Sequence, residues 1–195
     1  MTTRKIIGLL VGSFRASGNT KGIASWVEYC IKQSCPDSEV KIYTPVKPIN
    51  ILPECINPVA PLAVISPDDY VNPVIRRWAH AVSECDAYVI ITPEYNHSYS
   101  GYLKIMFDHL FNEFGGKPGT LITFASSGGE NAYKQLKNLA TKFGISPIDG
   151  MHFSIPRSYI TGRDRIAETF SPEKLMEDPF LKDLNDRLKE RLSHL

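Results

Sequence analysis

The sequence lacks a strong excess of charge of either sign. Its 195 residues carry 22 Lys and Arg against 21 Asp and Glu, so the formal net charge at pH 7 is +1. A chain balanced in this way has no global field that would attract nucleic acid or an anionic membrane surface. We therefore expect no nucleic-acid partner and no membrane partner, and any anion-binding site has to be local.

Long hydrophobic runs are also absent from the beginning of the chain. The apolar run after Lys5 covers only residues 6–11, which is too short for a signal peptide with its cleavage site or for a membrane span. We therefore expect a cytoplasmic protein. A chain of 195 residues can bury a full core and is short for two domains, so we expect a single domain over residues 1–195.

The four cysteines, Cys30, Cys35, Cys55 and Cys85, form no C-x-x-C pair. In a chain with no sign of export, buried free thiols are favoured over disulfides or metal ligands. We assign these cysteines no chemistry and expect no metal.

The hydrophobic pattern predicts an α/β fold. Strand-like runs cover residues 5–12, 39–43, 87–92, 119–125 and, less clearly, 146–155. Two of them, at residues 6–11 and 88–91, are continuous apolar runs of the kind that is typical of strands buried on both faces. Apolar residues at helical spacing lie between most of the strands, around Ile23 to Ile31, Val71 to Val82, Leu103 to Phe114 and Leu136 to Phe143. Five mainly parallel strands with interleaved helices indicate a three-layer, doubly wound domain.

Residues 44–67 do not follow this alternation of strands and helices. They contain six prolines, which block a long helix or a central strand. We predict a long Pro-rich loop here, and its apolar residues indicate that it packs on something. It either folds back over the core or forms a rim over a ligand or a partner subunit.

Residues 171–195 are predicted to form an amphipathic helical tail. Ser171-Pro172-Glu173 is a helix-start signature. The leucines at positions 181, 184, 188, 192 and 195 form one apolar stripe. This stripe docks either on its own domain or on a neighbouring subunit, and the sequence does not decide between them.

The turn after the first strand, Gly12 to Thr20, has the features of an anion site. A strand ends at Gly12 and a helix starts near Asn19 or Thr20, so several backbone amides have no helical partner. Ser13, Ser17, Asn19 and Thr20 add short donors, and Arg15 can grip phosphate oxygens with two hydrogen bonds. The pattern is neither G-x-G-x-x-G nor G-x-x-x-x-G-K-[ST], so a terminal monophosphate is favoured. The alternative is that the polar side chains only cap the helix while Arg15 is solvated.

Two further turns follow predicted strands and would lie at the same edge of the sheet. Residues 93–101 offer backbone groups together with polar and aromatic side chains that suit a flat heteroaromatic ring. The candidate ring-binding residues are Pro93, Glu94, Tyr95, Asn96 and His97. Ser126, Gly128 and Gly129 follow the fourth strand, where adjacent glycines allow positive φ and close backbone approach. The first turn and residues 93–101 together suggest one phosphorylated, planar ligand, and flavin mononucleotide (FMN) fits that description; the Ser-Gly turn is a third candidate whose signal is weak by itself.

These motifs resemble those of the NADPH-dependent FMN reductase family. The resemblance rests on Gly12-Ser13-x-Arg15 with Ser17 and Asn19, on Thr92-Pro93-Glu94-Tyr95-Asn96-x-Ser98, and on Gly101-x-Leu103-Lys104, in register from about Ile6 to Pro147. It implies a flavodoxin-like fold with a five-stranded parallel sheet in the order 2-1-3-4-5. It further implies that Ser13, Arg15, Ser17, Asn19 and Thr20 bind the FMN phosphate, while residues 93–97 border the ring. The chain departs from the family in Ile105-Met106-Phe107, which makes that helix more apolar than the family's usual Asn-Ala-Ile.

The resemblance implies an FMN-dependent NAD(P)H oxidoreductase, with NADPH or NADH as hydride donor. Its acceptors would be quinones, free flavin or related small molecules, reduced by ping-pong hydride transfer, and it would act as a homodimer or homotetramer. We propose no side-chain acid or nucleophile, because the flavin carries the chemistry. The alternatives are a non-enzymatic FMN-binding electron carrier and a redox-sensing module that binds a partner.

Overall fold

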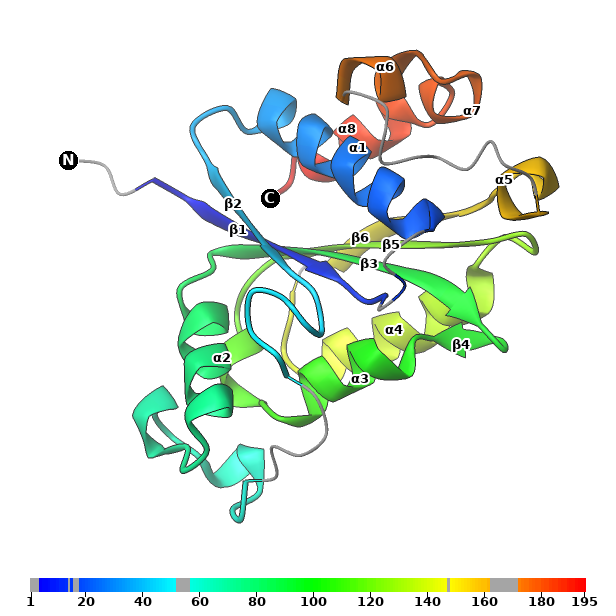
Figure 1. The fold of residues 1–195 in the computed structure, drawn as a ribbon. Helices are drawn as coiled ribbons and strands as arrows, with labels where there is room; N and C mark the ends of the chain where they lie inside the picture. Colours follow the sequence, from blue (N-terminus) through cyan, green and yellow to red (C-terminus); the bar gives the residue numbers. More distant parts are fainter. Residues whose placement is uncertain (1–3, 14, 16–17, 52–56, 147, 162–171) are drawn as a thin grey trace.

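The computed structural model describes residues 4–13, 15, 18–51, 57–146, 148–161 and 172–195. Its centre is a parallel sheet in the order β2-β1-β3-β5-β6, drawn edge-on in Figure 1. The strands are β1 (Ile6–Val11), β2 (Glu39–Tyr43), β3 (Ala87–Tyr95), β4 (Ser98–Tyr99), β5 (Gly119–Ala125) and β6 (Ile148–Ser154). The two-residue β4 pairs antiparallel with β3. Counting only the parallel strands, the order is 2-1-3-4-5, as expected.

Helices cover both faces of the sheet. The α-helices are α1 (Asn19–Ser34), α2 (Pro73–Ser83), α3 (Gly101–Asp108), α4 (Glu130–Lys142), α5 (Arg157–Thr161), α6 (Pro172–Glu177), α7 (Pro179–Lys182) and α8 (Asn185–Leu192). Short 3-10 turns occupy Pro61–Ala63, Pro67–Asp69 and Asn112–Phe114. Figure 1 shows α1 and α8 on one face and α2, α3 and α4 on the other, which gives the three layers that were expected.

The sheet interior is buried on both sides, as its continuous apolar runs predicted. Along β1 and β3, Ile7, Leu9 and Val89 pack toward α1, whereas Leu10 and Ile90 pack toward α2 and α3. Alternate residues of a strand point to opposite faces, so each run supplies two separate cores. This arrangement fixes the carboxyl ends of β1, β3 and β5 side by side.

The apolar pattern from Leu103 to Phe114 predicted one helix, but α3 ends at Asp108. Phe111 leaves helical geometry, with φ −148° and ψ −62°, and the Asn112–Phe114 turn follows. The Phe111 amide donates to the Glu113 carboxylate at 3.1 Å. A side chain thus replaces the helical carbonyl as acceptor, and the helix stops.

The Pro-rich segment lies partly over the core. Ile51 and Val64 are buried in the cluster beneath α2, and Asn112 Nδ2 donates to the Val64 carbonyl at 2.7 Å. Leu62 and Ile65, in contrast, are 64% and 85% exposed. The loop therefore folds back on the domain with one side and presents apolar side chains to solvent with the other. Residues 52–56, including Cys55, lie outside the described residues.

The tail forms three short helices, not one. The Asp178 side chain accepts hydrogen bonds from the Phe180 and Leu181 amides and caps α7, which Pro179 opens. A cap and a proline at this point separate α7 from α6. The stripe leucines 181, 184, 188 and 192 are nevertheless buried in the same cluster as α1 and the sheet. The tail therefore docks on its own domain.

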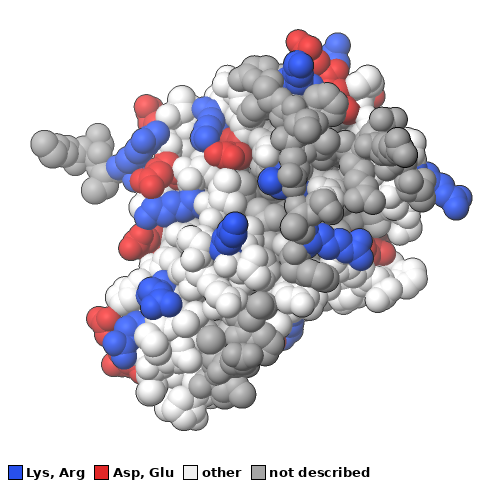
Figure 2. Space-filling model, in the orientation of Figure 1, with Lys and Arg blue, Asp and Glu red and all other residues white. Residues whose placement is uncertain are grey.

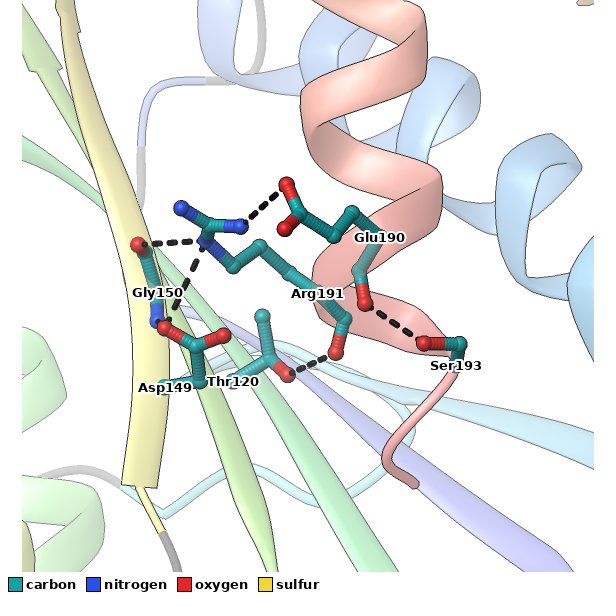
Figure 3. A network of polar contacts seen from close by, with 6 residues as sticks. All are labelled: Thr120, Asp149, Gly150, Glu190, Arg191 and Ser193. Atoms are coloured by element: carbon teal, nitrogen blue, oxygen red, sulfur yellow. Dashed lines mark hydrogen bonds and ion pairs between the residues drawn. The ribbon is translucent and has the colours of Figure 1, made fainter.

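Polar contacts fix α8 to the sheet. Arg191 Nε lies 3.3 Å from the Gly150 carbonyl and 3.4 Å from Asp149 Oδ1, and Thr120 Oγ1 donates to the Arg191 carbonyl at 3.3 Å. Figure 3 shows these contacts running from the last turn of α8 to β5 and β6. The end of the chain is thus tied to the sheet by hydrogen bonds as well as by leucines.

The surface shows no segregation of charge on the face drawn. In Figure 2, Lys and Arg side chains are interspersed with Asp and Glu over the coloured residues. Of the helices in the described ranges, not one is long and apolar enough to cross a membrane.

Candidate functional site

The turn after β1 is anchored to the centre of the sheet. The Gly12 amide donates to the Ile91 carbonyl of β3 at 2.7 Å. A Cβ atom on Gly12 would lie 2.7 Å from Leu103 Cβ, so only glycine fits between β1 and α3. The turn is therefore held close to the start of α3.

Helix α1 begins at Asn19, as predicted, with Gly18 at its N-cap. No side chain among the described residues caps this helix end. The Asn19 carboxamide instead donates to the Tyr159 carbonyl at 3.1 Å. The helix dipole and the amides of this first turn favour an anion here.

The segment after Thr92, predicted as a loop, is a β-hairpin. Strand β3 continues to Tyr95, and β4 pairs back with it through Tyr95↔Ser98. Asn96 and His97 form the two-residue turn with φ of 52° and 64°, the left-handed geometry that favours Asn in such hairpins.

Helix α4 holds this hairpin from the side. Gln135 Nε2 donates to the His97 carbonyl at 2.8 Å, and Ser98 Oγ donates to Gln135 Oε1 at 2.7 Å. His97 Nδ1 lies 3.2 Å from Asn131 Nδ2, although the ring itself is exposed. The hairpin backbone is therefore positioned by hydrogen bonds while His97 stays at the rim.

The buried side chain of Glu94 also links the hairpin to α4. Its carboxylate is 4% exposed, and Oε2 accepts a hydrogen bond from the Ala132 amide in the first turn of α4 at 3.1 Å. A carboxylate at a helix N-terminus offsets the helix dipole and an unpaired amide. One oxygen of Glu94 is thus committed to α4.

The glycine turn after β5 adopts the geometry that the sequence predicted. Gly128 and Gly129 have φ of 104° and 72°, and α4 starts at Glu130. A Cβ on Gly129 would lie 2.7 Å from the Phe124 amide nitrogen. Thr123 Oγ1 donates to the Gly129 carbonyl at 2.7 Å. The turn is therefore compact and depends on glycine.

Tyr95 connects the first turn to the hairpin. Its hydroxyl lies 3.2 Å from Ser13 Oγ, and the Arg15 guanidinium carbon lies 4.9 Å from the centre of its ring. Arg15 therefore has a cation–π partner in addition to solvent. Arg15 is exposed, as the alternative of a solvated side chain expects, and it also lies against the Tyr95 ring.

The three turns enclose one open cavity of about 600 Å³. Of the predicted residues, it is lined by Arg15, Asn19, Thr20, Pro93, Glu94, Tyr95, Asn96, His97 and Ser126. Ser13 contacts Tyr95 without lining the cavity, and Gly128 and Gly129 are not among its lining residues either. Ser17 lies outside the described residues.

Some residues that line the cavity were not among the predicted site residues. The additional lining residues are Gly18, Phe124, Ala125, Ser127, Ile155 and Ile160. Phe124 and Ala125 end a predicted strand, so the rule that ligands lie beyond strand ends could have found them. Ile155 and Ile160 follow β6, where the sequence carries no motif.

Residues 5–159 match the family model described as NADPH-dependent FMN reductase. The chain belongs to the NADPH-dependent FMN reductase family. NAD(P)H-dependent FMN reductase LOT6 of Saccharomyces cerevisiae is 30% identical over 154 residues, covering 77% of this chain and 81% of the relative. NAD(P)H-dependent FMN reductase ntnL of a Nectria species is 31% identical over 144 residues, covering 72% of this chain and 71% of the relative. Membership of this family confirms the resemblance and the predicted enzyme class.

Solved structures confirm the flavodoxin-like fold. The flavoenzyme NAD(P)H:(acceptor) oxidoreductase FerB from Paracoccus denitrificans superposes with a TM-score of 0.62 at 23% identity, over 97% of this chain and 98% of that one. An azoreductase from Bacillus anthracis superposes with a TM-score of 0.61 at 12% identity, over 98% and 100%. At these identities the likeness concerns the fold alone.

Proposed function

We propose that this member of the family is an FMN-dependent NAD(P)H oxidoreductase that reduces quinones, free flavin or related small acceptors by ping-pong hydride transfer. The observation that supports it is the cavity in which Arg15 and Tyr95 link the first turn to the hairpin at the carboxyl ends of β1 and β3. Ligands of doubly wound folds bind at this position.

The residues at one end of the cavity fit the phosphate of FMN. Arg15 supplies a fixed positive charge, and the start of α1 supplies backbone amides and a favourable dipole. Thr20 and Asn19 line the same end, and Ser13 lies within reach of Tyr95. We assign Ser13, Arg15, Ser17, Asn19 and Thr20 to the phosphate.

The remaining wall fits the isoalloxazine ring. Pro93 and Asn96 offer backbone groups that can pair with the donors and acceptors along the ring edge, and Tyr95 and Phe124 offer apolar surface. We assign Pro93, Glu94, Tyr95, Asn96, His97, Ser126, Gly128 and Gly129 to the ring side. Glu94 and Gly129 act by holding the α4 start and the glycine turn, as their contacts indicate.

Bound FMN would supply the redox chemistry, accepting a hydride from NADPH or NADH and passing it to the acceptor. The chain's own residues orient the ring and tune it by hydrogen bonds from the hairpin backbone. The open mouth of the cavity leaves room for donor and acceptor to bind in turn. No described side chain is assigned as an acid or nucleophile.

We further propose that residues 1–195 act as one domain and assemble as a homodimer or homotetramer in the cytoplasm. The shared core of the tail, α1 and the sheet supports one domain. The exposed apolar side chains of Val59, Leu62, Ile65 and Val71 support assembly, because exposed apolar surface favours contact with another protein. Light scattering on the purified protein measures the mass directly.

The enzymatic proposal is tested by turnover with small molecules alone. Purified protein supplied with FMN, NADPH and a quinone should oxidise NADPH steadily with no partner protein present. A protein that binds FMN but does not turn over would instead be an electron carrier or redox sensor.

A further inference from the structure

Two isoleucines from the connection after β6 give the cavity an apolar wall. Ile155 and Ile160 line it next to Phe124, which lies near the end of β5. Ile155 is only 4% exposed, whereas Ile160 is 38% exposed. Ile160 therefore lies at the rim of the cavity, where a molecule that enters from solvent meets it, and Ile155 lies deeper.

Ile160 belongs to α5, which has only five residues. A helix of this length is not stable by itself in water. Contacts with other elements therefore determine where α5 lies and where it holds Ile160.

Tyr159 connects α5 to two other parts of the domain. Its carbonyl accepts a hydrogen bond from the Asn19 carboxamide, in the first turn of α1, at 3.1 Å. Its hydroxyl donates to Asp178 Oδ2 at 3.0 Å. Its ring packs edge-on against Phe180 of α7, with the ring centres 5.9 Å apart. The short helix is thus held by α1 on one side and by the tail on the other.

Asp178 is a fixed partner for the Tyr159 hydroxyl. Its other oxygen, Oδ1, accepts hydrogen bonds from the Phe180 and Leu181 amides at 2.9 and 3.1 Å and caps α7. The Leu181 side chain is fully buried in the core that the tail shares with α1 and the sheet. One carboxylate therefore serves both the start of α7 and the position of α5.

The tail also supports the deeper part of the wall. The Phe180 ring packs against Phe153 of β6, with centres 5.8 Å apart, and Phe153 stacks on Phe124 at the same separation. Phe124 lines the cavity. The segment from Asp178 to Phe180 thus lies behind both the floor of the apolar wall and its rim.

We propose that Tyr159 is a positioning residue, which holds Ile160 at the rim through its bond to Asp178, and that Ile160 there contacts acceptors with an apolar or aromatic ring. A flat quinone buries apolar surface against such a side chain, and this burial favours its binding. An inorganic anion such as ferricyanide has no apolar surface to bury. The proposal rests on the proposed function, because it assigns a preference among that reaction's acceptors.

Steady-state kinetics with two acceptors test the assignment of Ile160. The acceptors are menadione, a naphthoquinone, and ferricyanide, with FMN kept saturating so that a change in FMN affinity does not enter the KM. We expect the KM for menadione to rise about threefold to tenfold in Ile160→Ala and in Tyr159→Phe, with kcat unchanged. The KM for ferricyanide should stay at its wild-type value in both variants.

Combined variants test whether Tyr159 acts through Ile160. The double variant Tyr159→Phe/Ile160→Ala should have the menadione KM of Ile160→Ala alone, because the second change removes the group that the first displaces. Asp178→Ser should match Tyr159→Phe: the serine oxygen still caps α7, but none is left for the Tyr159 hydroxyl. The control is Tyr29→Phe, a half-buried tyrosine of α1 that does not line the cavity, which should keep the wild-type KM.

Hydrogen exchange on the flavin-free, full-length protein gives a readout that does not depend on turnover. The amides of residues 157–161 should exchange faster in Tyr159→Phe and Asp178→Ser than in wild type and Tyr29→Phe, because α5 has lost its bond to the tail.

The proposal is overturned if Tyr159→Phe leaves the menadione KM or the exchange of α5 unchanged. It is also overturned if the KM for ferricyanide rises equally, or if the effects of Tyr159→Phe and Ile160→Ala multiply in the double variant. A wild-type protein that reduces neither acceptor would overturn the proposed function, and the acceptor preference with it. In that case the exchange data would still decide whether Tyr159 holds α5.

Discussion

The guanidinium carbon of Arg15 lies 4.9 Å from the centre of the Tyr95 ring. These two residues are 80 positions apart in the sequence. Their side chains join the turn after β1 to the hairpin that β3 forms with β4. The Tyr95 hydroxyl also lies 3.2 Å from Ser13 Oγ. A single tyrosine thus contacts both the basic side chain and the serine of the first turn, so it joins the turn that we assign to the phosphate to the hairpin that we assign to the ring.

Replacing Arg15 with Ala should weaken FMN binding. If Arg15 binds the phosphate as we propose, the change removes a charged hydrogen bond worth about 1.5–3 kcal/mol, and the dissociation constant should rise about tenfold to a hundredfold. Fluorescence titration of the flavin-free protein measures this. Arg77→Ala, at an exposed position on α2, should leave FMN affinity unchanged, and an unchanged affinity in Arg15→Ala would refute the phosphate assignment.

Replacing Glu94 with Gln should destabilise the start of α4. The Gln side chain keeps the shape of Glu but has no negative charge. It therefore accepts the hydrogen bond of the Ala132 amide more weakly and no longer offsets the helix dipole. We expect the free energy of unfolding to fall by about 1–2 kcal/mol. Urea unfolding measures the difference. Glu130→Gln changes a carboxylate in the same helical turn that faces solvent and should have a smaller effect. Equal effects in the two variants would contradict this role of Glu94.

Replacing Gly129 with Ala should cost more than replacing Gly116 with Ala. Both residues have positive φ, 72° and 76°, so each substitution incurs left-handed strain of about 1–2 kcal/mol. Only at Gly129 would the new Cβ meet backbone, 2.7 Å from the Phe124 nitrogen, whereas Gly116 has open space. The overpacking should add about 1–3 kcal/mol to the free-energy loss. Thermal and urea unfolding of the two variants test this. If Gly129→Ala is as stable as Gly116→Ala, the turn accommodates the new Cβ at no cost and the prediction is wrong.

The buried thiols should be inert in the folded protein. Burial raises the pKa of Cys85 to about 11 and that of Cys30 to about 12, so both stay protonated at neutral pH and thiolate attack is suppressed. Iodoacetamide should modify neither peptide in mass spectrometry unless urea is present. Because the pKa of the Cys85 thiol is higher in the folded state than its ordinary value of 9.0, the free energy of unfolding should fall as pH rises from 9 toward 11. Rapid labelling of Cys85 in the native protein would contradict its burial.

The strands were predictable because the parallel sheet is buried on both faces. Residues 39–43 and 119–125 form β2 and β5 with the predicted bounds. The hairpin was not predictable by the same rule, because β3 continues through Pro93 to Tyr95 and changes there from a buried to a half-buried strand. Neither was the end of α3, which depends on the Glu113 carboxylate accepting from Phe111, a contact that no hydrophobic period encodes.

The residues that line the cavity also fall into those that the sequence could predict and those that it could not. Arg15, Asn19 and Tyr95 were predictable, because each lies in a motif directly after a strand. Ile155 and Ile160 were not, because they reach the cavity from the connection after β6, and only the folded sheet places that connection beside β5. The structural role of Glu94 likewise depends on α4 packing against the hairpin, which is a tertiary contact.

The visible absorption spectrum of the purified protein under anaerobic NADPH tests the central claim most directly. We expect a yellow protein, or one that becomes yellow on adding FMN, whose flavin absorbance bleaches rapidly with NADPH and returns on adding a quinone. A flavin that stays oxidised under NADPH would contradict the reductase proposal, and a colourless protein that does not take up FMN would contradict the assignment of the cavity.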